Sequence, residues 1–130
     1  MSDSYRLLRI ALAVFGFLML LLYPLAVVWP SGWAWHHGSP HESQYFMMIV
    51  GVYATLGAFL INAARNPQAH ASLIWFTVVS SVVHALIMAV QSLQMPEHAG
   101  HLLGDVPALL IAAAILAALF RPDAKAAATR

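Results

Sequence analysis

The sequence contains no cysteine and very little charge, and both deficits exclude whole classes of function. Without cysteine there are no disulfides, thiolate metal sites, thiol redox centres or cysteine nucleophiles. Charged residues make up 8% of the 130 residues and hydrophobic residues 62%, whereas a soluble domain carries about 25% charged residues. This composition predicts an integral membrane protein whose apolar surface faces lipid.

Several catalytic and binding motifs are also missing. The chain has no GxSxG, P-loop or HExxH sequence, so hydrolysis by a serine nucleophile, P-loop phosphoryl transfer and zincin chemistry find no support. The six basic residues are scattered rather than clustered as a nucleic-acid footprint, so no nucleic-acid partner is expected. Whether the protein is an enzyme stays open at this level.

Four apolar segments are present at residues 7–29, 43–64, 71–94 and 102–120. Each is close to the roughly 20 residues that a helix needs to cross the hydrocarbon core of a membrane. The separators are rich in proline, glycine and asparagine, which predicts antiparallel hairpins between adjacent helices. We therefore expect an all-α four-helix bundle in one domain, 1–130, ending in a short flexible cytoplasmic tail at 121–130.

The basic residues predict the orientation, because all of them fall on one side of this topology. They are Arg6, Arg9, Arg65, Arg121, Lys125 and Arg130. Loops rich in Lys and Arg stay in the cytoplasm, so both termini are expected there.

The first outer loop, residues 29–42, is unusually rich in tryptophan and histidine. Trp29, Trp33 and Trp35 are typical of an aromatic belt at the membrane interface. Five histidines are expected on this outer side and are candidate ligands for zinc or copper: His36, His37, His41, His98 and His101. Solvated loop histidines without a metal remain the alternative, since their spacing is not diagnostic.

The third segment carries a polar stripe centred on His84. Thr77, Ser80, Ser81, Met88, Gln91 and Met95 all fall within about 60° of it on a helical wheel. The stripe should face the bundle interior, where His84 serves either as a hydrogen-bonding strut between helices or as part of a ligand site.

Asp105 adds a carboxylate at the start of the fourth segment, on one face with His98 and His101 if the helix begins early enough. A carboxylate at the bilayer centre is unfavourable by about 2.5–3.5 kcal/mol, so Asp105 should pair, protonate or face water. Matching the spans by depth brings His84, Gln91, Asp105, Tyr45 and Tyr53 into one polar pocket that opens outward between the second, third and fourth segments. Copper, zinc, quinone and haem are compatible cofactors, although only His84 lies deep enough for haem ligation and none of the four is singled out.

The run from Gly51 to Leu60, followed by Ala63, Ala64 and Arg65, resembles small four-helix bacterial membrane proteins of the DoxX-like group. Residues 29–35 and 101–107 are more similar to an uncharacterised subgroup. The resemblance implies a multi-pass protein of the bacterial inner membrane and a link to respiratory or redox complexes. The resemblance supplies no activity. The outward-facing polar pocket leads us to expect an accessory or ligand-binding protein that forms a homo-oligomer or joins a larger membrane complex. A redox-linked membrane enzyme or subunit handling quinone or copper is the alternative.

Overall fold

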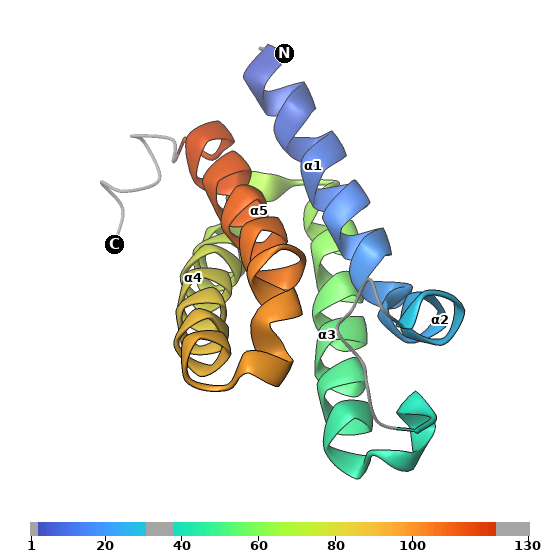
Figure 1. The fold of residues 1–130 in the computed structure, drawn as a ribbon. Helices are drawn as coiled ribbons and strands as arrows, with labels where there is room; N and C mark the ends of the chain where they lie inside the picture. Colours follow the sequence, from blue (N-terminus) through green and yellow to red (C-terminus); the bar gives the residue numbers. More distant parts are fainter. Residues whose placement is uncertain (1–2, 31–37, 122–130) are drawn as a thin grey trace.

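The structure is a computed structural model, and it describes residues 3–30 and 38–121, without the side chains of residues 96–98. Within these ranges the chain is helical and contains no strand. Figure 1 shows the five α-helices, which are α1 (Asp3–Leu20), α2 (Leu22–Val28), α3 (Gln44–Ala63), α4 (Ala71–Gln94) and α5 (Asp105–Leu119). Three 3₁₀ helices join them: η2 (Pro40–Glu42), η3 (Pro67–His70) and η4 (Pro96–Leu102).

Three stretches are long and apolar enough to cross a membrane: Gln44–Ala63, Pro67–Gln94 and Ala99–Leu119. Only 17 to 28% of their apolar windows is buried inside the protein, so most of this surface needs an apolar environment outside it. A fourth span exists if α1 and α2 together form one. These helices indicate a multi-pass membrane protein.

The apolar segment predicted as one span at 7–29 is divided into two helices, because α1 and α2 are bent by 56° at Leu21. Pro24 explains the break. A proline in a helix lacks the N–H that would bond to the carbonyl four residues earlier, here that of Leu20, and its ring crowds that carbonyl. The chain resumes a helix at Leu22, where Leu25 N–H donates to the Leu21 carbonyl at 2.9 Å.

The helices pack in two pairs, α1 with α3 and α4 with α5, and α1 also touches α5. This differs from the predicted bundle of consecutive hairpins, since α3 and α4 are neighbours in sequence but are not closely packed along their lengths (Figure 1). The stretch Arg65 to His70 between them is long enough to let the two helices diverge.

Two glycines explain why α1 approaches α3 so closely. A Cβ atom built on Gly57 would lie 2.5 Å from the Gly16 carbonyl oxygen, and one built on Gly16 would lie 2.6 Å from the Gly57 carbonyl oxygen. Any larger side chain at either position therefore collides with the opposite backbone. Small residues at such a crossing let membrane helices approach closely and gain van der Waals contact. This contact is important because lipid tails are as apolar as the helices, so the hydrophobic effect does not drive the helices together.

The most buried side chains gather where α1, α3, α4 and α5 meet. Leu8, Leu12, Leu60, Ile74 and Leu116 are each no more than 1% exposed. This core lies towards one end of the molecule, close to the start of α1 and the end of α3.

Two hydrogen bonds hold that same end together. Arg9 Nε donates to the Ala64 carbonyl at 2.7 Å, and Gln68 Nε2 donates to the Arg121 carbonyl at 2.9 Å. They join the start of α1, the end of α3, η3 and the end of α5. The four described arginines, Arg6, Arg9, Arg65 and Arg121, therefore lie at one end, which we call the arginine end.

Candidate functional site

A tyrosine on α3 and a histidine on α4 make the polar link between the two helix pairs. Tyr53 Oη and His84 Nδ1 are hydrogen-bonded, and their ring centroids are 5.8 Å apart. Either the hydroxyl donates to a bare Nδ1 or a protonated Nδ1 donates to the hydroxyl oxygen, so the pair suits both imidazole tautomers. The two residues were predicted to share a depth, and the structure brings them into contact.

A second polar pair lies at the start of α5. His101 Nδ1 and Asp105 Oδ2 are 2.6 Å apart, and their side chains are 19% and 16% exposed. Asp105 is the first residue of α5, where the positive end of the helix dipole favours a carboxylate. Of the three alternatives expected for Asp105, which were pairing, protonation and contact with water, the structure shows pairing. The pairing does not require a helix that begins before His101, because His101 belongs to η4 and α5 begins only at Asp105.

The two pairs form one electrostatic unit. Asp105 interacts with both Tyr53 and His84, and His101 also acts on His84. We call these four residues, Tyr53, His84, His101 and Asp105, the polar tetrad. It draws on α3, α4, η4 and α5, and no single element contains it.

Two other residues predicted to line the pocket lie apart from the tetrad. Tyr45, near the start of α3, is 71% exposed, and Gln91 on α4 is also exposed. Both are on surfaces that a membrane or another chain would cover. The smaller polar residues of the α4 stripe bond to their own helix, since Thr77 Oγ1 donates to the Leu73 carbonyl at 2.9 Å.

Ser92, which sequence reasoning did not single out, is 4% exposed and its Oγ has no hydrogen-bond partner within the described part of the chain. It lies eight residues after His84, or about 12 Å along α4.

The structure brings together few of the predicted metal ligands. His36 and His37 lie outside the described residues, as does the side chain of His98. His41 is exposed in η2, and His101 is paired with Asp105. Across residues 3–30 and 38–121, no group of three or more His, Asp or Glu side chains is placed to hold a metal ion.

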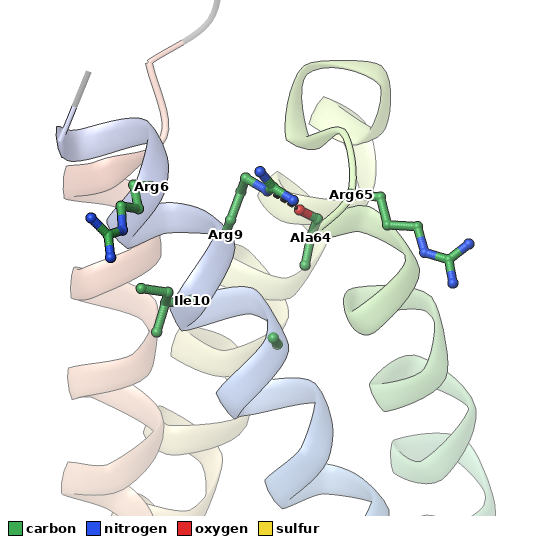
Figure 2. A pocket seen from close by; sticks show the side chains of 6 residues that line it. Arg6, Arg9, Ile10, Ala64 and Arg65 are labelled. Atoms are coloured by element: carbon green, nitrogen blue, oxygen red, sulfur yellow. Dashed lines mark hydrogen bonds between the residues drawn. The ribbon is translucent and has the colours of Figure 1, made fainter. Parts of the chain in front are cut away.

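A cavity of about 380 Å³ opens at the arginine end, far from the tetrad. It is lined by Arg6, Arg9, Ile10, Ala13, Ala64 and Arg65 (Figure 2). Along α3, eleven residues separate Tyr53 from Ala64 at the cavity, which is about 17 Å, and the His101–Asp105 pair lies at the start of α5. Sequence reasoning used these arginines for orientation alone. The sequence indicated this cavity only through a four-residue spacing. That spacing places Ile10 one turn after Arg6, and Ala13 one turn after Arg9, on one face of a helix.

A single family accounts for nearly the whole chain, since residues 2–129 match the family of unknown function DUF6632. The protein belongs to DUF6632. Nothing in this match connects the chain to DoxX-like proteins. No curated protein matches it. No solved structure matches it either. The family carries no assigned activity, so a functional argument has to rest on the two sites.

Proposed function

We propose that this protein is a small multi-pass membrane protein that binds a compact hydrogen-bonding ligand at the polar tetrad, acting as an accessory or ligand-binding protein. The proposal is carried by one observation: two hydrogen-bonded pairs, Tyr53 with His84 and His101 with Asp105, lie within electrostatic range of each other.

Structural support alone is a poor explanation for the tetrad. A hydrogen bond between membrane helices contributes about 0.6 kcal/mol on average, whereas a carboxylate within the bilayer is unfavourable by about 2.5–3.5 kcal/mol at the centre and by less near an edge, where Asp105 begins α5. One Tyr–His bond would suffice to link α3 and α4. Adding Asp105 and His101 nearby stabilises the fold little, which favours a role in binding.

The tetrad has the chemistry to recognise a carbonyl or hydroxyl group. A tyrosine hydroxyl and an imidazole can each donate or accept a hydrogen bond, while an ionised carboxylate only accepts. A ligand entering between Tyr53 and His84 would exchange their mutual bond for two bonds to itself. The ligand gains most if it offers both a donor and an acceptor.

A redox-linked role with quinone is the second candidate, favoured by the nearness of the two pairs. Reduction of a quinone to a quinol takes up two protons and two electrons. In this version the His101–Asp105 pair would exchange a proton with His84, and the electrons would come from a partner subunit. The copper version depends on His36 and His37, which lie outside the described residues.

The test is to isolate the full chain from membranes in polymer-bounded discs, without detergent, and to quantify bound metals and extractable small molecules. The double variant His84→Leu/Asp105→Leu removes the tetrad, and Tyr45→Phe/Gln91→Leu is the matched control on exposed positions. A stoichiometric compound in the wild type and control that is lost from the double variant supports the proposal. A quinone would select the redox version.

Two results would refute the proposal. One is a wild type that carries no stoichiometric compound, metal or quinone. The other is a double variant with the stability, assembly and bound molecules of the wild type, because a built polar site should not accept two apolar replacements unchanged.

The orientation is part of the proposal: both termini and the arginine end face the cytoplasm. It is supported by the grouping of all four described arginines at one end. Since the chain has no cysteine, Asp3→Cys and Glu42→Cys each introduce a single thiol. In intact cells, a membrane-impermeant maleimide should label position 42 and leave position 3 unlabelled, and the opposite pattern would reverse the orientation.

A further inference from the structure

The cavity at the arginine end is lined by three arginines. Arg6 and Arg9 come from α1, and Arg65 follows the end of α3. Figure 2 shows Arg9 reaching from α1 towards Ala64, with Arg6 on one side of it and Arg65 on the other. The bond from Arg9 Nε to the Ala64 carbonyl fixes this side chain and uses one of its five N–H donors.

These charges lack acidic partners. Within residues 3–30 and 38–121, none of the three arginines forms an ion pair. The ion pair present in this part of the chain joins His101 to Asp105 in the tetrad. The Ala64 carbonyl is at the end of α3, so the negative end of a helix dipole offsets part of the Arg9 charge. Arg6 and Arg65 are both exposed.

The wall below the arginines is apolar. Ile10 and Ala13 lie one turn further along α1 than Arg6 and Arg9, and Ile10 is 49% exposed. The cavity therefore carries positive charge at its outer rim and hydrocarbon towards the middle of the molecule. An anionic phospholipid has the same order of groups, whereas free phosphate would satisfy only the rim.

We infer that this cavity binds an anionic phospholipid of the leaflet at the arginine end. The headgroup phosphate lies against Arg6 and Arg9, an acyl chain follows Ile10, and Arg65 adds attraction for the negative surface. Basic pockets between membrane helices bind anionic headgroups by this combination of charge and apolar contact. The inference is independent of the ligand proposed for the tetrad, since the two sites share no residue.

Native mass spectrometry of the purified full chain tests the inference. The protein is titrated with phosphatidylglycerol, with phosphatidylethanolamine of identical acyl chains, and with inorganic phosphate. Arg6→Gln/Arg65→Gln removes two charges from the rim without breaking the Arg9–Ala64 bond. Arg121→Gln is the matched control, because it removes a charge from the same end outside the cavity. Helix content and elution volume verify that each variant folds.

The wild type should bind phosphatidylglycerol in preference to phosphatidylethanolamine. Each lost arginine should weaken phosphatidylglycerol binding about fivefold, the factor equivalent to about 1 kcal/mol per basic residue at an anionic surface, so the double variant should lose about 25-fold. The control should stay within about twofold of the wild type. If Arg121→Gln weakened phosphatidylglycerol binding as much per lost charge as the double variant does, the inference would be overturned. Binding would then depend on the general surface charge and not on the cavity. Saturable binding of inorganic phosphate that displaces the lipid would also overturn it in favour of a free anion.

Discussion

The crossing of α1 and α3 at two glycines makes the sharpest stability prediction. Replacing Gly57 by alanine places a Cβ 2.5 Å from the Gly16 carbonyl oxygen and 3.1 Å from Met19 Cβ. Ordinary van der Waals contact begins at 3.4 Å, so the two helices have to separate by about 1 Å. Neither partner atom is at the end of a flexible side chain, which leaves movement of the backbone as the response.

The magnitude follows from two opposing effects. Overpacking in a well-packed region destabilises by about 1–3 kcal/mol. Exchanging glycine for alanine inside a helix stabilises by about 0.5–1 kcal/mol through backbone entropy. Gly51, on the same helix, has no atom within 4 Å of a built Cβ, so Gly51→Ala experiences only the second effect. Gly57→Ala should therefore be less stable than Gly51→Ala by about 1–3 kcal/mol.

Unfolding of the detergent-solubilised protein by dodecyl sulfate, followed by tryptophan fluorescence and circular dichroism, measures this difference. Gly16→Ala should resemble Gly57→Ala. The double variant should lose less than the sum, because one alanine already separates the helices. Equal stability of Gly51→Ala and Gly57→Ala, or strict additivity of Gly16→Ala with Gly57→Ala, would refute a direct contact between the two backbones.

Three further predictions concern other elements. In a double-mutant cycle with Tyr53→Phe and His84→Leu, the coupling energy in the same unfolding assay should be about 0.6–2 kcal/mol; additivity within error would show that the hydrogen bond contributes nothing. Ser92→Ala removes a buried hydroxyl without a partner and should leave stability unchanged or raise it by up to about 1 kcal/mol, whereas a loss of more than this would reveal a partner for Ser92. Pro24→Ala restores a helical N–H and should reduce the 56° bend, so spin labels at the start of α1 and the end of α2 should move apart by about 3 Å; an unchanged distance would assign the bend to packing instead.

The contact between Tyr53 and His84 in the tetrad was predictable, because the depth of a residue in the membrane follows from its distance along the helix from the end of its span. Tyr53 and His84 lie near the middle of spans whose ends are marked by loops, so matching the spans placed them opposite each other. Tyr45 was matched by the same count but is exposed, since depth says nothing about which way a side chain faces. Gln91 was predicted to face the interior with His84 but is exposed, because the buried face of α4 is centred on residues such as Ser81 and Ala85 instead. His101 was assigned to a metal site, and its contact with Asp105 across the junction of η4 and α5 depends on the local turn geometry.

Other features had local signals whose meaning depends on context. Pro24 breaks the first predicted span, yet a proline within a membrane helix is often tolerated, so its effect was not evident from composition. The glycines at 16 and 57 became informative only once α1 was known to pack against α3. The same holds for the arginines, which form a cavity because α1 starts beside the end of α3.

The sequence by itself determined the membrane class, the approximate spans, and the grouping of the described arginines at one end, because hydrocarbon thickness and charge act on each segment separately. Only the tertiary structure decided the pairing of α1 with α3 and of α4 with α5. Apolar residues surround the whole circumference of a helix such as α5, so periodicity does not identify its packing face. In lipid that choice depends on steric fit between backbones and on a few polar contacts, and both become visible when the helices are placed side by side.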